Sequence, residues 1–229
     1  MKIITVPDLH GKESWNTLDP SVYDKIIFLG DYVDSKGYFS DREELTNLER
    51  IIEFKLCYPN KVELLIGNHD LHYLYFPLYR ASSFNVQLQP VLSALFKSNR
   101  ECFTYAFQIG SHLWTHAGVS NSWFDYHQDT IQSFTEKDTI KELGSILNLM
   151  GFHHLDELAT ISTIRGGLGV HGGIMWADKS ETIKDYLPGI HQYVGHSRVQ
   201  HITMVGDEIS SIYYLDCLNS EEKFFVLDL

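Results

Sequence analysis

The sequence is short of several features that mark particular classes of protein. Its three cysteines, Cys57, Cys102 and Cys217, form neither a C-x-x-C pair nor a disulfide framework, so we expect a reducing compartment. No apolar run approaches the roughly 18 residues that a membrane span needs. The N-terminus reaches Pro7 and Asp8 after a short apolar run and therefore predicts no signal peptide. These absences predict a soluble, cytoplasmic protein.

Positive charge is also scarce. The 229 residues include 18 lysines and arginines against 30 acidic residues, a formal net charge of -12. Such a surface repels phosphate backbones and anionic lipids, so neither nucleic acid nor a membrane is an expected partner. The remaining composition, 44% hydrophobic and 21% charged, is that of an ordinary globular chain. With no repeat and no linker-like segment, the sequence predicts a single domain over residues 1–229.

Three short apolar runs in the N-terminal part predict buried strands. They cover residues 2–6, 25–30 and 62–67, and each is closed by a proline or a glycine. A helix is predicted between the second and the third. This alternation of strands and helices is typical of a sheet with parallel strands and covering helices.

The helix has a clear beginning and end. Ser40 and Glu43 have the spacing of a capping box, and Pro59 stops the pattern. The apolar positions predicted to share its buried face are Leu45, Leu48, Ile52 and Leu56.

The second half of the sequence alternates less regularly. Residues 102–118 predict two strands around a Gly-Ser turn, a hairpin, and residues 120–160 predict mainly helices. The segments "QYVGHS", "HITMVG", "EISSIYYLDC" and "KFFVLDL" then predict consecutive strands. We expect a mixed α/β core followed by an antiparallel tail.

Polar side chains follow each predicted strand. "PDLHG" ends the first, "GDYVD" the second and "GNHD" the third. Because residues beyond the carboxyl ends of parallel strands meet in one crevice, these side chains are expected to converge. The set comprises Asp8, His10, Asp31, Asn68 and His69, with His116 of "THAG" and His196 of "VGHS" from two later strand ends.

This mixture of carboxylate, imidazole and amide groups indicates a particular chemistry. It suits Mn, Fe or Zn better than calcium. Asp31 is the candidate for a carboxylate shared between two cations, an arrangement that can clamp a phosphate and activate water. The alternative interpretation is that such strand-end residues only form turns.

The five motifs together resemble those of the calcineurin-like metallophosphoesterases. "PDLHG", "GDYVD", "GNHD", "THAG" and "VGHS" run from residue 7 to residue 197. They are most similar to the pattern of the phosphoprotein phosphatase branch, in its small bacterial and phage type. The resemblance implies an α/β fold, namely a four-layer α/β/β/α sandwich with mixed sheets, and a dinuclear metal site.

The resemblance also implies roles for individual residues. The first metal would be held by Asp8, His10 and Asp31, and the second by Asp31, Asn68, His116 and His196. His69 would be a general acid oriented by Asp34. An aspartate beside an imidazole favours the protonated form, which can donate to a departing alkoxide.

Two arginine positions depart from the family pattern. Ser35 stands where relatives carry a phosphate-binding arginine, and Lys36 and Arg42 are possible substitutes. Arg165, in the glycine-rich "RGGLGVHGG", is our candidate phosphate clamp, with a structural loop arginine as the alternative. Smaller members carry this arginine in a W-x-R triplet, where the present sequence has Asp178.

The final motif separates branches of the family. Many diesterases end in G-H-x-H, whereas this chain has "GHSR" with Arg198, which favours a phosphatase. The predicted activity is hydrolysis of a phosphomonoester, in which two divalent metals activate a water molecule for in-line attack on phosphorus. Mn is the preferred metal, with Fe and Zn as alternatives. The substrate could be a phosphoprotein, a nucleotide or a small phosphoester. Alternatives are a phosphodiesterase, a dinucleoside polyphosphate hydrolase, or an inactive scaffold. The other eight histidines are interpreted as surface or hydrogen-bonded side chains.

Overall fold

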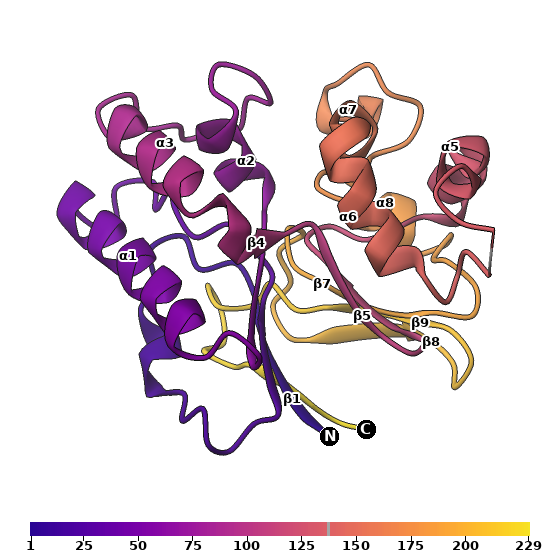
Figure 1. Cartoon of the computed structure of the whole chain (residues 1–229), viewed down its shortest axis with the longest axis horizontal. Coiled ribbons are helices and arrows are strands. Elements are labelled where there is room, and N and C mark those ends of the chain that lie inside the picture. Colours follow the sequence, from indigo (N-terminus) through magenta and orange to yellow (C-terminus); the bar gives the residue numbers. More distant parts are fainter. Residues whose placement is uncertain (137) are drawn as a thin grey trace. The chain divides into compact units, whose positions relative to one another are not determined.

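The computed structural model describes residues 1–136 and 138–229, and the chain divides into two compact units. The first unit comprises Met1–Thr104 and Glu222–Leu229, and the second comprises Tyr105–Glu221. Each unit contains a mixed five-stranded sheet with a helix packed on it (Figure 1). The predicted mixed α/β class is therefore confirmed, whereas the single domain over residues 1–229 stays a prediction.

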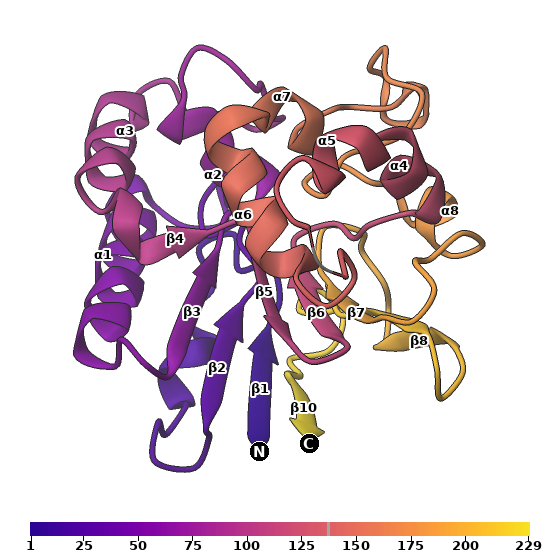
Figure 2. The ribbon, with the colours of Figure 1, turned by 45° about the vertical axis from the view of Figure 1, so that its right-hand side comes forward.

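The sheet of the first unit carries the three predicted N-terminal strands. Its strand order is β10-β1-β2-β3-β4, with β1 to β4 parallel and β10 antiparallel to β1 (Figure 2). The strands are β1 (Lys2–Val6), β2 (Lys25–Phe28), β3 (Val62–Leu65), β4 (Phe103–Thr104) and β10 (Phe225–Asp228). The β-branched and leucine side chains of β1, β2 and β3 are almost completely buried, as expected for parallel strands covered on both faces, whereas Val226 of the edge strand β10 is 41% exposed. The parallel direction brings the carboxyl ends of β1, β2 and β3 to one edge.

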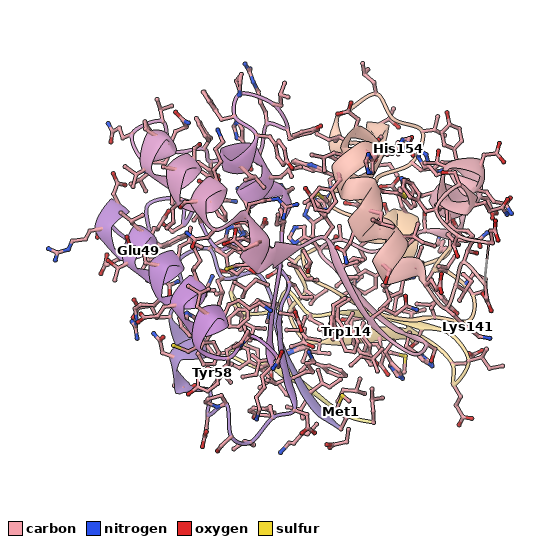
Figure 3. The ribbon with its side chains drawn as sticks, in the orientation of Figure 1. Met1, Glu49, Tyr58, Trp114, Lys141 and His154 are labelled. Carbon is pink, nitrogen blue, oxygen red and sulfur yellow. The ribbon has the colours of Figure 1, made fainter. Side chains whose placement is uncertain are left out.

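Helix α1 (Asp41–Cys57) begins where the capping box predicted. The backbone N–H of Ser40 donates to the Glu43 carboxylate at 2.7 Å, and the backbone N–H of Glu43 donates to the Ser40 hydroxyl oxygen at 3.3 Å. The helix packs against β3. Its buried face differs from the prediction, because Leu56 is 58% exposed. Leu48 and Ile52 are buried as predicted, and Leu45 is half-buried. Glu44, Asn47 and Ile51 are also buried, while Glu49 lies on the exposed face (Figure 3).

Two shorter helices complete this unit. They are α2 (Asn68–Leu74), which begins directly after β3, and α3 (Gln89–Ser98), which packs against α2. Two 3-10 turns, Ser14–Thr17 and Arg100–Cys102, connect other elements. The aromatic run after α2 folds back on it, with the rings of Phe76 and Phe84 stacked at 5.4 Å and that of His72 at 4.1 Å from Phe84. Those aromatic residues therefore pack against one another and α2.

The sheet of the second unit has the order β5-β6-β7-β9-β8. Its strands are β5 (Ala106–Ile109), β6 (His112–Thr115), β7 (His191–Val194), β8 (Thr203–Gly206) and β9 (Ser211–Tyr214). The predicted hairpin is confirmed as the antiparallel pair β5 and β6. Trp114, labelled in Figure 3, is fully buried on β6 and stacks on Tyr193 of β7 at 4.6 Å. The sheet core continues through Val194, Ile212 and Tyr214.

Two sequence expectations were wrong in this region. The run that begins at residue 102 is one strand in the prediction, but β4 pairs with β3 of the first unit and β5 belongs to the second sheet. The C-terminal tail is not simply antiparallel. β7 is parallel to both β6 and β9, only β8 and β9 pair antiparallel, and β10 returns to β1.

The helices of the second unit lie mainly in the predicted range. They are α4 (Asn121–Tyr126), α5 (Gln128–Gln132), α6 (Leu143–His153), α7 (Leu155–Leu158) and α8 (Lys179–Thr182), with a 3-10 turn at Thr163–Arg165. Residue 137, inside the range 120–160 predicted as helical, lies outside the described residues. Helix α6 packs on β5. Across the described chain, every helix falls short of the length and apolarity that crossing a bilayer requires.

Candidate active site

The loops after β1 and β2 interlock through their backbones. The N–H groups of Leu9 and His10 both donate to the carbonyl of Asp31, at 3.1 and 2.8 Å, and Gly11 N–H donates to Tyr32 at 2.9 Å. The first two motifs are therefore fixed to each other by main-chain bonds. Asp8, 2% exposed, lies two residues after the end of β1 and two residues before His10.

The third motif approaches Asp31 more closely than any residue with a side chain would allow. A Cβ atom on Gly67 would lie 2.1 Å from Oδ1 of Asp31, so only glycine fits this position. Asp70, three residues further on, accepts hydrogen bonds from the N–H groups of Asp31, Tyr32 and Gly67 at 2.7, 3.0 and 2.9 Å. Asp70 thus joins the loops after β2 and β3.

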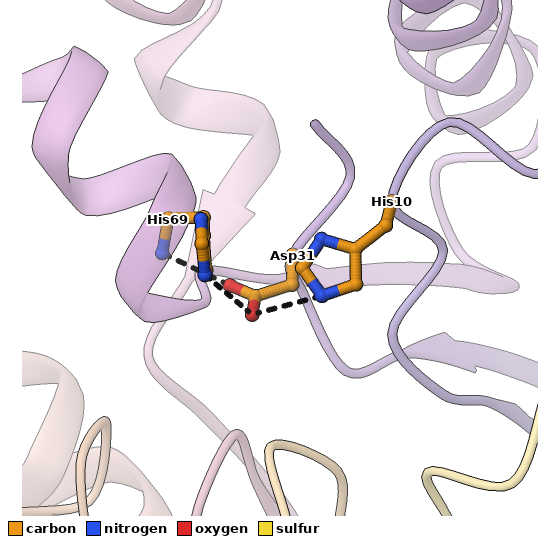
Figure 4. A group of neighbouring side chains, drawn as sticks. All are labelled: His10, Asp31 and His69. Carbon is orange, nitrogen blue, oxygen red and sulfur yellow. Dashed lines mark hydrogen bonds and ion pairs between the residues drawn. The ribbon is translucent and has the colours of Figure 1, made fainter. Parts of the chain in front are cut away.

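Around Asp31 the structure brings two histidines together (Figure 4). Oδ2 of Asp31 lies 3.7 Å from Nε2 of His10 and 4.0 Å from Nε2 of His69, and Oδ1 accepts the His69 N–H at 3.0 Å. The two imidazole rings are 5.0 Å apart and nearly perpendicular. One ligand atom from each of these three residues lies within 4.8 Å of the others, a spacing that a metal ion can bridge. Asn68 precedes His69 at the start of α2 and is also buried.

His10 has the properties of a neutral metal ligand. Burial lowers the pKa of His10 to about 4, despite the opposing charge of Asp31, so the ring is neutral near pH 7. Its Nδ1 lies 2.9 Å from the carbonyl oxygen of Val33. A carbonyl can only accept, so Nδ1 carries the proton and Nε2, which faces Asp31, keeps its lone pair. This is the arrangement that orients metal-binding imidazoles, and the donor set therefore fits a divalent cation.

His69 differs from His10 in its charge preference. Its Nδ1 lies 2.7 Å from Oδ2 of Asp34, whose side chain is fully buried. Burial acts to lower the pKa of His69, but the carboxylates of Asp31 and Asp34 outweigh it, and the pKa is raised above its ordinary value. The cluster therefore contains one imidazole that favours the neutral form and one that favours the protonated form.

Ser35 is buried beside this pair and takes part in the loop structure. Its N–H donates to Glu44 at 2.7 Å, and its hydroxyl oxygen accepts from Phe39 N–H at 3.2 Å. Arg42, a possible substitute for the missing arginine, is exposed on the first turn of α1. Lys36, the other, lines a cavity of about 520 Å³ with Asp34 and residues of the segments 35–44 and 83–87.

The second unit positions the two late histidines. His116 follows β6 and is fully buried, His196 follows β7, and their rings are 5.0 Å apart. Trp176 packs its ring edge-on to His196 at 5.6 Å. The described part of this unit therefore holds two imidazoles close enough to serve one cation.

Arg165 is held by two residues of the same unit. Its Nε lies 2.7 Å from Oδ2 of Asp178, and its Nη2 donates to the hydroxyl of Ser197 at 3.0 Å. Oδ1 of Asp178 caps α8 by accepting from Ser180 N–H at 2.8 Å. The acid at the W-x-R position is thus the ion-pair partner of the arginine that the sequence analysis selected. Neither contact uses Nη1 of Arg165.

The other histidines contact protein groups. His127 and His154 lie 2.9 and 3.1 Å from the carboxylate oxygens of Glu157, and His191 lies 2.8 Å from Ser211. Arg198 is exposed. These contacts agree with a structural interpretation of the histidines that the motifs leave out.

Comparison with known proteins decides the family. Residues 1–200 match the calcineurin-like phosphoesterases. The chain belongs to this family. The proposed site residues lie within the matched region, as do all five motifs.

Individual relatives agree with this membership. A protein of Schizosaccharomyces pombe named as a serine/threonine-protein phosphatase is 38% identical over 73 residues, which are 30% of this chain and 22% of that protein. The chain therefore spans only about a fifth of the length of that relative. The crystal structure of a cold-active protein-tyrosine phosphatase from a psychrophilic Shewanella species covers 99% of this chain and 75% of its own, with a TM-score of 0.60 and 15% identity. That likeness shows the fold alone.

Sequence reasoning missed several residues that support these groups. Glu44 accepts from the N–H groups of Asp34 and Ser35, and Tyr73 donates its hydroxyl to Asp34. One sequence signal was available for Tyr73, because it follows His69 by four residues and so lies on the same face of a helix. The contact between Arg165 and Asp178 had no such signal, since the two residues are 13 positions apart in the sequence and do not share a helix.

Proposed function

We propose that this chain is a metal-dependent phosphomonoesterase of the serine/threonine phosphatase type. Family membership supports phosphoester hydrolysis, and the contact between His69 and Asp34 beside Asp31 is the observation that carries the finer proposal. The "GHSR" ending favours a monoester over a diester. A phosphorylated compound is then the substrate.

The proposed dinuclear centre has a defined set of ligands. Asp8, His10 and Asp31 would hold one cation, and Asp31, Asn68, His116 and His196 the other, with Mn²⁺ preferred over Fe and Zn. The motif order supports this set, as does the neutral, carbonyl-bonded imidazole of His10. When bound, two such cations supply a water of lowered pKa and stabilise charge on the phosphoryl oxygens.

The charge balance of the ligands favours an anionic substrate. Two divalent cations bring about four positive charges against the two ligand carboxylates, Asp8 and Asp31. The local field is then positive although the whole chain carries a formal net charge of -12. A phosphate dianion is attracted to such a site.

The protein's own groups perform the remaining steps. His69 keeps its Nδ1 proton on Asp34 and presents Nε2, from which it donates a proton to the oxygen of the departing alcohol. Arg165, fixed by Asp178 and Ser197, would bind phosphoryl oxygens through the part of its guanidinium that these contacts leave. Phosphorus is attacked in line by water, with no covalent enzyme intermediate.

Hydrolysis assays test this proposal. The purified protein should hydrolyse an aryl phosphomonoester in manganese buffer and should act far more slowly on the bis-aryl diester. Metal analysis should find two divalent ions per chain, and Asp31→Asn should lose both metal and activity. Faster hydrolysis of the diester would contradict the proposed substrate class, and a protein with two bound metals and no turnover would contradict the enzyme. His69→Asn with full activity and full metal content would exclude the proton-donor role.

A further inference from the structure

Tyr73 lies one helical turn after His69 on α2, and both side chains reach the same carboxylate. The Tyr73 hydroxyl donates to Oδ1 of Asp34 at 2.5 Å, and Oδ2 of Asp34 lies 2.7 Å from Nδ1 of His69. Tyr73 is 0% exposed, and so is the side chain of Asp34. Each oxygen of this buried carboxylate therefore has its own partner, and both partners come from one helix.

The direction of the hydrogen bond from Tyr73 is determined by a third group. The backbone N–H of Asn85 points at the Tyr73 oxygen at 2.9 Å. An N–H group can only donate, so the phenol oxygen accepts there and its own proton is directed to Asp34. The Asn85 side chain in turn donates to Asp41 at 2.8 Å, which fixes this loop to the first turn of α1. A chain of bonds thus runs from Asn85 through Tyr73 and Asp34 to His69.

The orientation of the Asp34 carboxylate depends on such hydrogen bonds, because the backbone of Asp34 does not fix it. Its φ of 65° is in the left-handed region, and its backbone N–H donates to Oε2 of Glu44 at a distance of 3.2 Å. The terminal torsion of an aspartate has a broad, shallow energy profile, so backbone position alone does not orient the carboxylate. A second hydrogen bond on Oδ1 restricts that rotation.

We propose that Tyr73 is a positioning residue, whose hydroxyl holds the Asp34 carboxylate in the orientation that presents Oδ2 to Nδ1 of His69. This inference rests on the proposed function, in which His69 protonates the leaving oxygen. Tyr73 does not touch the substrate. It acts by keeping the imidazole at one angle, so that Nε2 points to a constant place when the ester bond breaks.

The consequence is a selective defect. An ester whose alcohol is a poor leaving group depends on proton donation, whereas a nitrophenolate departs without it. Tyr73→Phe keeps the ring and removes one oxygen. It should lower kcat for an alkyl phosphate about tenfold more than kcat for 4-nitrophenyl phosphate, since proton donors typically contribute about 10²–10⁴-fold and only part of this is lost. KM should be unchanged for both substrates.

A matched variant separates positioning from simple destabilisation. Tyr193→Phe also removes a buried phenol oxygen, which lies 2.8 Å from Nδ1 of His112 in the second unit. Any change that Tyr193→Phe causes in kcat should be by the same factor for the alkyl phosphate and for 4-nitrophenyl phosphate. An equal loss on the two substrates with Tyr73→Phe would overturn the inference, and so would wild-type rates on both.

A spectroscopic measurement tests the same contact without turnover. In chelator-treated protein, the Nδ1 proton of His69 should give a downfield resonance typical of a strong bond to a carboxylate. Tyr73→Phe should shift or broaden this signal, and Tyr193→Phe should leave it unchanged. An unchanged signal in Tyr73→Phe would overturn the positioning role even in a protein with no activity. Inactivity of the wild-type protein on both esters would count against the proposed function alone.

Discussion

Asp70 offers a stringent test of how the candidate site is held together. It is 0% exposed, and it accepts three backbone hydrogen bonds from two different loops. Oδ2 accepts from Asp31 and Gly67, and Oδ1 accepts from Tyr32. We expect Asp70→Asn, a change of one atom type, to destabilise the first unit strongly.

The magnitude follows from counting donors. The amide of asparagine has only one oxygen. If that oxygen takes the place of Oδ2, the NH₂ group takes the place of Oδ1 and faces the N–H of Tyr32. The NH₂ group and the Tyr32 N–H are then both left without an acceptor. Unsatisfied buried groups cost about 1–3 kcal/mol each, so the expected loss for the two groups is roughly 2–6 kcal/mol, a fall of about 4–24 °C in Tm. Burial and the neighbouring Asp31 charge raise the pKa of Asp70, while the three N–H groups oppose this shift. Removing the charge therefore recovers some repulsion and favours the lower end of the range.

Thermal unfolding of chelator-treated protein measures the effect without contribution from metal. Asp207→Asn is the matched control, because Asp207 also accepts two backbone N–H groups, from Ile209 and Ser210 at 2.9 and 3.0 Å, but in an exposed turn where water can replace it. The control should melt with the wild-type protein. If Asp70→Asn also melts with the wild type, or if both variants fall equally, the three buried bonds do not have the assigned role.

Three further predictions concern pH, phosphate and metal. Burial lowers the pKa of His10 to about 4, so between pH 4 and about 6.5 the unfolded chain binds a proton more readily than the folded protein does. The free energy of unfolding of the chelator-treated protein should therefore be highest above pH 6.5 and should fall by about 3 kcal/mol as the pH drops to 4. Urea unfolding should find a smaller fall in His10→Gln. Arg165→Ala should lower kcat/KM about 10–150-fold through loss of charge-assisted bonds. Asp178→Asn, which keeps the helix cap, should raise KM without changing Tm, and an unchanged KM would contradict its role as anchor. Mn²⁺ at 100 times its Kd should stabilise the wild type by about 2.7 kcal/mol but not Asp31→Asn, as calorimetry can determine.

Local signals in the sequence were sufficient for most elements of the fold. The capping box of Ser40 and Glu43 located the start of α1, and the glycines after β2 and β3 marked where the site residues begin. Apolar spacing predicted the buried face of α1 only in part: it found Leu48 and Ile52 but missed the buried polar residues. Glu44 and Asn47 are buried because they bond to loops, Glu44 to Asp34 and Ser35, and Asn47 to Trp15. A polar residue with distant partners looks like a surface residue in the sequence.

Pairing between distant segments was the other limit. Strand periodicity gives no information on partners, so the change of sheet at Tyr105 and the return of β10 to β1 were not predictable. The same applies to Arg165. Its loop position made a clamp and a structural arginine equally compatible with the sequence, and only the fold brings Asp178 within 2.7 Å of it.

The backbone of the candidate site carries strain that glycine would avoid. His10, Asp31, Asp34 and His196 have φ values of 46°, 53°, 65° and 60°, in the left-handed region that costs a residue with a side chain about 1–2 kcal/mol. All four lie in loops that follow strands, where this chain also uses glycine, as at Gly30 with φ of 97°. Glycine would relieve the strain but offer neither carboxylate nor imidazole. Retaining side chains there is therefore unfavourable for stability alone, and it requires surrounding bonds that hold the loops in place. The three N–H groups that donate to Asp70 and the two that donate to the Asp31 carbonyl provide such bonds. The strained backbone that presents the site's carboxylates and imidazoles therefore depends on these hydrogen bonds.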